Sequence, residues 1–138
     1  MKEQCDFPAF TAYRLEENML HVEMKKVKEL TSRDVEQIYE CHHKIGNGNK
    51  VYVLVTFQGY IPMSDEAMTQ AKKNSSVDQI TAATAYVVKN IALRISVKFF
   101  MNFYKPKHPM TIWGTKQEAI AWLKLEKKKN AEKQMVLA

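Results

Sequence analysis

Two short runs near the start of the chain alternate between apolar and polar residues. They occupy positions 10–15 and 19–24, and the polar residues Glu16, Glu17 and Asn18 between them are typical of a turn. Alternation with a period of two places every second side chain on the same face of a strand. The pattern therefore predicts an antiparallel hairpin with one buried face.

Three later runs also have the composition of strands. Residues 50–57 are almost continuously apolar, which is typical of a central strand covered on both faces. Residues 79–88 are small, β-branched and uncharged, which predicts a second buried strand packed closely under helices. Residues 110–113 predict a short edge strand.

The segment between the hairpin and the central strand has the signals of a helix. We expect this helix at about 32–44, with Thr31 as its N-cap and Gly46 as its stop. Residues three or four positions apart share one side of a helix. The expected apolar stripe consists of Val35, Ile38, Tyr39 and His42.

Two further helices are marked by their N-caps. Ser64 is expected to cap a helix that runs to about residue 73, before a closing segment at 74–76. Thr115 and Glu118 have the spacing of a capping box, which opens the final helix. The apolar stripe of this helix is expected to consist of Ala119, Ile120, Trp122, Leu123 and Leu125.

Residues 90–104 predict a longer helix that is apolar around most of its circumference. One side carries Ile91, Ile95, Phe99 and residues 101–103, and another carries Leu93, Val97, Phe100 and Tyr104. The polar line consists of Arg94, Lys98 and Asn102. Pro106 ends the helix because the residue before a proline is disfavoured in the α region. Such a helix is buried on more than one side or faces a partner.

The elements follow the order ββαβαβαβα, which predicts a single α/β domain with a mixed sheet. A chain of 138 residues with 46% hydrophobic residues suits one domain, from 1 to 138, with a lysine-rich tail from about 124. No run of about 18 uncharged apolar residues is present, and the first residues lack the apolar stretch of a signal peptide. We therefore expect a soluble, cytoplasmic protein in which Cys5 and Cys41 are free thiols.

The net charge of +6 does not predict a nucleic-acid partner. About half of this charge lies in the tail after Leu123, where lysines favour solubility and the helix dipole. The rest of the chain lacks the alternation of arginine and aromatic residues that nucleic-acid surfaces show.

The last third of the chain resembles the SpoIIAA-like proteins of the STAS/SEC14 grouping. The similar motifs are the helix end at 99–106, the strand at 109–113, and the run Glu-Ala-Ile-Ala-Trp-Leu at 118–123. The resemblance spans about residues 50–123. It implies a SpoIIAA/STAS-like mixed sheet and a regulatory interaction role, while the relationship to SEC14 implies an apolar ligand or contact with a membrane surface.

The best-known relatives are phosphorylated on a serine at the start of the helix after the central strand. The matching loop here, 57–65, lacks their Asp-Ser-Ser/Thr-Gly-like motif. Ser64 is expected to be a plain helix cap, because Asp65 and Glu66 would repel a phosphate at the same helix start. A classical phosphorylation switch is therefore not expected.

A search for catalytic or metal-binding groups gives no convincing set. Cys41, His42 and His43 are consecutive, whereas metal ligands on one helix favour spacings of three or four. His21 lies on a predicted strand, and His108 is expected to be solvated in a loop. No glycine pattern matches a phosphate-binding loop. We expect no enzymatic activity, no metal and no cofactor.

The surplus of apolar residues on the long helix, together with the loop after the central strand, forms the candidate surface. In open α/β sheets ligands gather at the carboxyl ends of strands. The candidate residues are Tyr60, Ile61, Met63, Arg94, Lys98, Phe99, Phe100, Phe103 and Tyr104. Three interpretations stay open: an ordinary packed core, a surface for a homodimer or regulatory protein partner, and a site for an apolar ligand or lipid whose headgroups would meet the two cations. The sequence favours a non-enzymatic regulatory or protein-interaction module, with the ligand-binding or membrane-surface module as the alternative.

Overall fold

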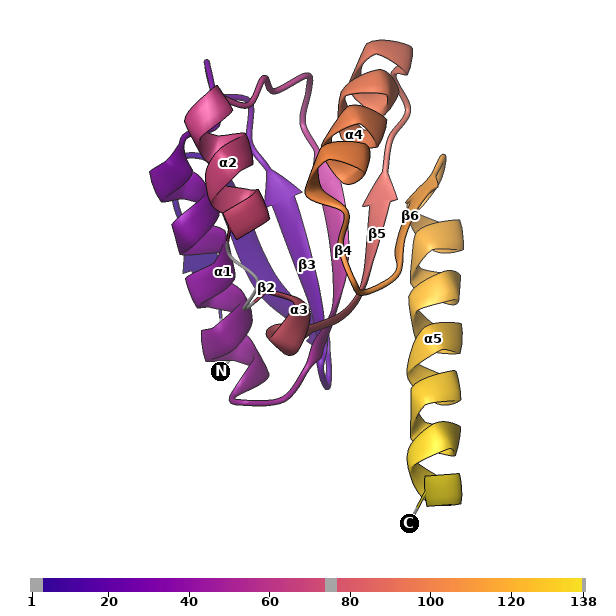
Figure 1. The fold of residues 1–138 in the computed structure, drawn as a ribbon. Coiled ribbons are helices and arrows are strands. Elements are labelled where there is room, and N and C mark those ends of the chain that lie inside the picture. Colours follow the sequence, from indigo (N-terminus) through magenta and orange to yellow (C-terminus); the bar gives the residue numbers. More distant parts are fainter. Residues whose placement is uncertain (1–3, 74–76, 138) are drawn as a thin grey trace.

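The computed structural model describes residues 4–73 and 77–137 and contains one mixed six-stranded sheet (Figure 1). The strands, in the order in which they lie side by side, are β1 (Gln4–Asp6), β2 (Phe10–Glu16), β3 (Met19–Met24), β4 (Val51–Phe57), β5 (Thr81–Val87) and β6 (Met110–Trp113). The strands β1 to β3 pair antiparallel, and β3 to β6 pair parallel. The predicted α/β class is confirmed.

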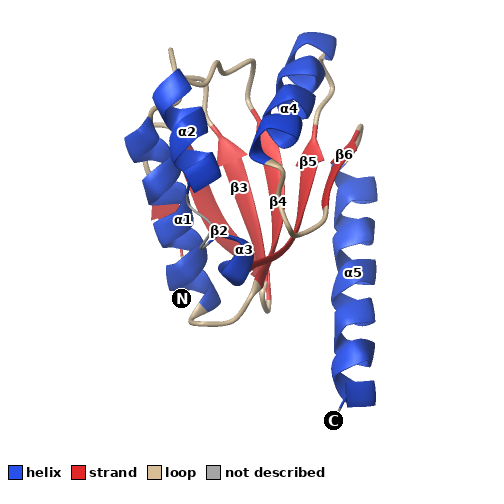
Figure 2. Ribbon diagram, viewed as in Figure 1, coloured by secondary structure: helices blue, strands red, loops and turns tan. Residues whose placement is uncertain are grey.

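Helices cover both faces of this sheet (Figure 2). They are α1 (Ser32–Gly46), α2 (Asp65–Lys73), the short α3 (Val77–Ile80), α4 (Ile91–Tyr104) and α5 (Lys116–Leu137). The helices α1, α2 and α4 lie on one face (Figure 1), where α2 contacts both α1 and α4. The helix α5 packs on the other face, against β4, β5 and β6.

Each face has its own hydrophobic core because side chains alternate along the strands. On the face of α1, Val53 and Val55 of β4 pack with Leu20 and Val22 of β3. On the other face, Leu54 packs with a group that comprises Met19, Tyr52, Ala83, Ala85, Ala119 and Leu123. The prediction that β4 is a central strand covered on both sides is confirmed.

Two elements were not predicted. The strand β1 has three residues and pairs with β2, and it is too short to show a period of its own. The helix α3 occupies the start of the run predicted as a strand at 79–88, so β5 begins at Thr81. The predicted closing segment at 74–76 lies outside the described residues.

The predicted antiparallel hairpin is confirmed, but the expectation of one buried face is wrong for β3. All residues of β3 except Glu23 are buried, because β3 lies between β2 and β4 and is covered on both sides. The preceding turn places Asn18 in the left-handed region, at φ 60°. Asparagine tolerates this conformation better than most residues.

The predicted caps are confirmed, with small changes at the helix ends. The Thr31 hydroxyl accepts a hydrogen bond from the Asp34 N–H at 3.3 Å, and the Asp34 carboxylate accepts one from the Thr31 N–H at 2.9 Å. Gly46 is the last residue of α1 rather than its stop, and Asn47 forms the left-handed C-cap at φ 50°. Thr115 caps α5 as predicted: its hydroxyl accepts a hydrogen bond from the Glu118 N–H at 3.2 Å and donates one to the Glu118 carboxylate at 2.8 Å.

The stripe predicted for α5 is correct except at its end. Ala119 and Leu123 are fully buried, and Ile120 and Trp122 are partly buried against the sheet. Leu125 is exposed to 50% and is therefore not part of this stripe. The helix itself continues through the lysine-rich segment to Leu137.

Candidate functional site

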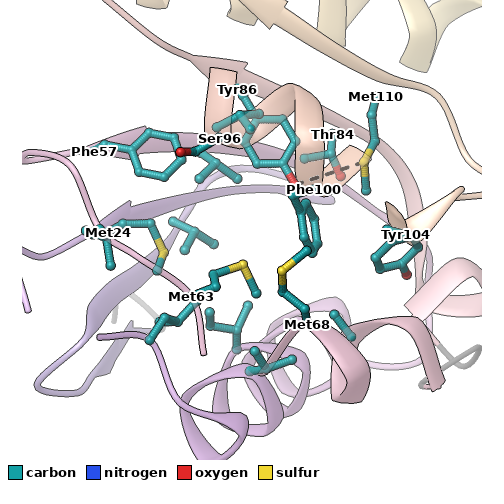
Figure 3. A pocket seen from close by; sticks show the side chains of 18 of the residues that line it. Met24, Phe57, Met63, Met68, Thr84, Tyr86, Ser96, Phe100, Tyr104 and Met110 are labelled. Atoms are coloured by element: carbon teal, nitrogen blue, oxygen red, sulfur yellow. Dashed lines mark hydrogen bonds between the residues drawn. The ribbon is translucent and has the colours of Figure 1, made fainter. Parts of the chain in front are cut away.

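A cavity of about 450 Å³ lies between the sheet and the layer formed by α1, α2 and α4. Figure 3 shows that side chains of the sheet and of all three helices surround it. The large apolar side chains among them include Met24, Phe57, Met63, Met68, Tyr86 and Phe100. Ligand pockets are commonly of this size and are mostly apolar.

The floor of the cavity is formed by side chains from one face of the parallel strands. Val53, Val55 and Phe57 occupy alternate positions of β4, so they point to the same side of the sheet. Val22 and Met24 of β3 lie beside Val55 and Phe57 in the parallel register. The alternation of the strands therefore supplies a continuous apolar floor.

The wall on the side of α1 is the stripe that the sequence predicted. Val35, Ile38, Tyr39 and His42 all line the cavity. The expected inner face of this helix is therefore confirmed.

The opposite wall is α4, which has an inner and an outer apolar side. Asn90 caps this helix by accepting hydrogen bonds from the N–H groups of Ala92 and Leu93, at 2.8 and 3.2 Å. The inner side chains Leu93, Val97 and Tyr104 are buried, and Phe100 is half-buried. The outer side chains Ile91, Ile95 and Phe99 are exposed to 79%, 64% and 61%. The predicted separation of these two sides is confirmed, except that Met101, which was grouped with the outer side, packs against Leu93 and Val97.

The edge of the cavity near the carboxyl end of β4 carries exposed apolar groups. Tyr60 follows β4 and is 49% exposed, and it lines the cavity together with Ile95 and Phe99 of α4. The Ser96 hydroxyl donates a hydrogen bond to the Tyr60 hydroxyl at 3.4 Å, which connects α4 to the loop after β4. We call Tyr60, Ile95, Ser96 and Phe99 the lip.

The other residues predicted for the site fall into two groups. Ile61, Met63, Phe100 and Tyr104 line the cavity. Arg94 and Lys98 are exposed and lie outside its lining. Phe103 also lies outside the lining, and its ring is 4.8 Å from the ammonium group of Lys72 on α2, in a cation–π contact.

A cluster of buried polar side chains, which the sequence did not predict as part of the site, lies away from the lip. His42 Nδ1 is 3.5 Å from the Thr81 hydroxyl, and His108 Nε2 is 3.1 Å from the Thr84 hydroxyl. All four side chains are at most 8% exposed and line the cavity. The expectation that His108 is solvated is wrong, because its loop packs it against β5. We call these four residues the polar end.

Electrostatics couple the two histidines of the polar end. Burial, followed by the positive charge that His108 can carry, lowers the pKa of His42 to about 4. His42 is therefore neutral at physiological pH. The signal for this cluster in the sequence was weak: two threonines within a run of small residues, and histidines separated by more than sixty positions.

Ser64 has the structural role expected of it. Its hydroxyl accepts a hydrogen bond from the Ala67 N–H at 2.9 Å at the start of α2, beside the exposed Asp65 and Glu66. The prediction that Ser64 is a helix cap is confirmed.

A second buried histidine network lies on the opposite face of the sheet. The His21 ring lies between the Tyr13 hydroxyl, 2.5 Å from Nδ1, and the Thr56 hydroxyl, 2.7 Å from Nε2. Burial lowers the pKa of His21 to about 4, and Lys116 adds to this effect. Both ring nitrogens have protein partners, so we assign this network to the stability of the sheet.

The two cysteines are free and buried, and they come from β1 and α1. Burial, followed by hydrogen bonding to Cys5, raises the pKa of the Cys41 thiol. Within the described ranges, no group of three or more histidine, cysteine, aspartate or glutamate side chains is arranged to hold a metal ion. None of the helices in the described part of the chain has the length and apolar composition needed to cross a membrane.

Comparison with known proteins places this architecture in context. A model of the family described as Domain of unknown function (DUF7793) matches residues 13–127. No curated protein matches the chain. The fold is similar to a crystal structure of an uncharacterized protein from the DUF3478 family, with a SpoIIAA-like fold, from Shewanella loihica PV-4. The match covers 89% of this chain and 95% of the other, with a TM-score of 0.57 and 15% sequence identity. This likeness confirms the SpoIIAA-like fold.

Proposed function

The chain belongs to the DUF7793 family, and we propose that it acts as a non-enzymatic module that binds an apolar ligand between its sheet and α4. The observation that carries the proposal is the cavity of about 450 Å³ behind α4. Protein interiors are normally close-packed and leave few voids larger than a water molecule. A cavity of this size therefore favours ligand binding over the interpretation of an ordinary packed core.

The lip supports the same proposal. Tyr60, Ile95 and Phe99 are exposed and line one edge of the cavity, and a contiguous exposed apolar patch of this kind marks a contact or ligand-binding site. Their position at the carboxyl end of the parallel strands is where open α/β sheets bind ligands. A ligand could enter between Tyr60 and α4 with only local movement of the lip.

The composition of the lining favours binding over catalysis. Among the described residues that line the cavity, none is a carboxylate, a lysine, an arginine or a cysteine. The proposal includes no catalytic step and no nucleic-acid partner.

The test is the binding of an uncharged fluorescent probe, N-phenyl-1-naphthylamine, to the full chain. We expect saturable binding of one probe per chain. Ser96→Trp, which fills the cavity from the lip, should abolish it. Asn102→Trp is the matched control, because Asn102 lies on the exposed polar side of the same helix and should leave binding unchanged.

Two results would overturn the proposal. One is a wild-type chain that is folded, as shown by circular dichroism, and does not bind the probe. The other is a folded Ser96→Trp variant that binds the probe as the wild type does.

The outer side of α4 supports a second candidate function, which is protein recognition or self-association. Ile91, Ile95 and Phe99 form one exposed apolar row at a spacing of four residues. Ile91 does not line the cavity, so Ile91→Asp should weaken self-association in sedimentation velocity while probe binding persists. Asn102→Asp serves as the control on the polar side. A wild-type chain that stays monomeric at high concentration would contradict self-association.

A further inference from the structure

The cavity has chemically different ends. The polar end lies where the parallel strands begin, since Thr81 is the first residue of β5 and pairs with Val51, the first residue of β4. The lip lies beyond Phe57, where β4 ends. The backbone of β4 rises by about 20 Å from Val51 to Phe57 at the usual rise per residue, so His42 and Thr81 lie about one strand length from the lip, whereas Thr84 lies in the middle of β5. This distance suits an extended chain better than a compact ring system.

The imidazole of His42 has unused hydrogen-bonding capacity. Its Nε2 atom is buried and has no hydrogen-bond partner among the described residues. Within the described ranges, its Nδ1 atom has one contact, the long 3.5 Å contact with Thr81. Buried polar atoms are normally paired, and leaving one unpaired is costly. Nε2 is therefore a place where the polar group of a ligand would gain a hydrogen bond that the empty protein lacks.

The polar end excludes ligand heads that carry a permanent charge. The titratable groups among the described residues of the lining are His42, His108, Tyr39, Tyr60, Tyr86 and Tyr104. A phosphate or a quaternary ammonium would lose its hydration without a permanent counter-charge. A head that can exchange one proton with an imidazole avoids this penalty, because the buried pair stays neutral overall.

From this arrangement we infer that the ligand is a monocarboxylic acid with a hydrocarbon tail, whose head is held by His42 at the polar end and whose tail extends toward the lip. The inference rests on the proposed binding function. A carboxylic acid offers a donor and acceptors on adjacent atoms, so it can bond to an imidazole and to a threonine hydroxyl together. The single negative charge of one carboxylate is balanced by one protonated imidazole. Protonation of both His42 and His108 is disfavoured, because the two rings lie close together and their positive charges would repel.

The experiment compares dodecanoic acid with its methyl ester, below their aggregation limits, as competitors of bound N-phenyl-1-naphthylamine. The tails are identical, so a difference in affinity reports the head. We expect the acid to bind roughly tenfold more tightly than the ester, as one additional buried hydrogen bond predicts. Calorimetry in two buffers of different ionisation enthalpy should show uptake of about one proton with the acid and none with the ester.

Variants locate the head in the cavity. His42→Leu removes the imidazole. In this variant the affinity for the acid should fall until it equals the affinity for the ester. His43→Leu is the matched control, since His43 is exposed on the same helix and should preserve the preference. The near-isosteric Thr81→Val removes the hydroxyl that lies 3.5 Å from Nδ1 of His42. It should lower the affinity for the acid and leave the affinity for the ester unchanged, and it provides the test if His42→Leu does not fold.

The outcomes separate this inference from the proposed function. If the wild type binds the probe but acid and ester compete equally, or neither competes, the inference is wrong and the binding function stands. A preference for the acid that survives in folded His42→Leu also overturns the inference. If the folded wild type does not bind the probe, the proposed function fails first.

Discussion

The Tyr13 phenol oxygen lies 2.5 Å from Nδ1 of His21, across the antiparallel pair of β2 and β3. The other nitrogen of the same ring lies 2.7 Å from the Thr56 hydroxyl on β4. One imidazole thus connects the antiparallel part of the sheet with its parallel part.

Tyr13→Phe should destabilise the fold by about 1–3 kcal/mol, because it removes the partner of a buried ring nitrogen. Urea unfolding followed by circular dichroism measures the change. Tyr60→Phe is the control. Tyr60 is half-exposed, so water can take the place of its hydroxyl as the hydrogen-bond partner of Ser96. Equal stability of Tyr13→Phe and wild type would show that this contact does not stabilise the sheet.

The free energy of unfolding should decrease as the pH falls from about 6.5 to about 4. Burial lowers the pKa of His21 and of His42 to about 4 from the ordinary value of 6.5. In this pH window the two histidines bind protons in the unfolded chain but not in the folded chain, so acid favours unfolding. Above pH 6.5 both histidines are neutral in both states and contribute no pH dependence to the free energy of unfolding. Each histidine contributes a slope of about 1.4 kcal/mol per pH unit.

Urea unfolding at a series of pH values measures this slope. His42→Leu should reduce this slope, since one of the two neutral buried imidazoles is gone. A slope that is the same in His42→Leu and wild type would contradict the role assigned to His42.

Gly46→Ala should destabilise the protein by about 1–3 kcal/mol through a clash. A Cβ atom on Gly46 would lie 2.8 Å from Cγ1 of Val51, whose side chain is fully buried, so one of the two must shift. Gly114→Ala is the matched control, because a Cβ atom there would have no heavy atom within 4 Å in the described part of the chain, apart from its two chain neighbours. Thermal unfolding of the two variants should separate them, and similar melting temperatures would refute the explanation.

Leu123→Ala should cost about 2–5 kcal/mol, because Leu123 is fully buried between α5 and the sheet. Leu125→Ala should change the stability by less than about 0.5 kcal/mol, because half of that side chain is exposed. Urea unfolding measures both. Comparable losses would mean that α5 packs on the sheet by a different side.

Much of the site was accessible to sequence reasoning, but as separate pieces. The period of four in α4 identified its inner and outer sides, and the stripe on α1 was predicted with His42 included. The spacing could not show that these sides face each other across an open volume. Arg94 and Lys98 were predicted as cations for lipid headgroups and Phe103 as part of the apolar surplus, and the structure places all three outside the lining.

The α/β class, the central strand, the caps and the ends of most helices could be predicted from the sequence. These features depend on interactions between neighbours in the chain, such as the reciprocal bonds of Thr31 and Asp34, so they leave a local signature. The tertiary structure alone decided the pairing of β1, the cavity and the burial of His108. His42 and Thr81, or Thr84 and His108, lie 39 and 24 positions apart, and their contacts arise from the packing of α1 and the loop before β6 against β5. Such contacts depend on how whole layers pack, and no local pattern encodes the space left between them.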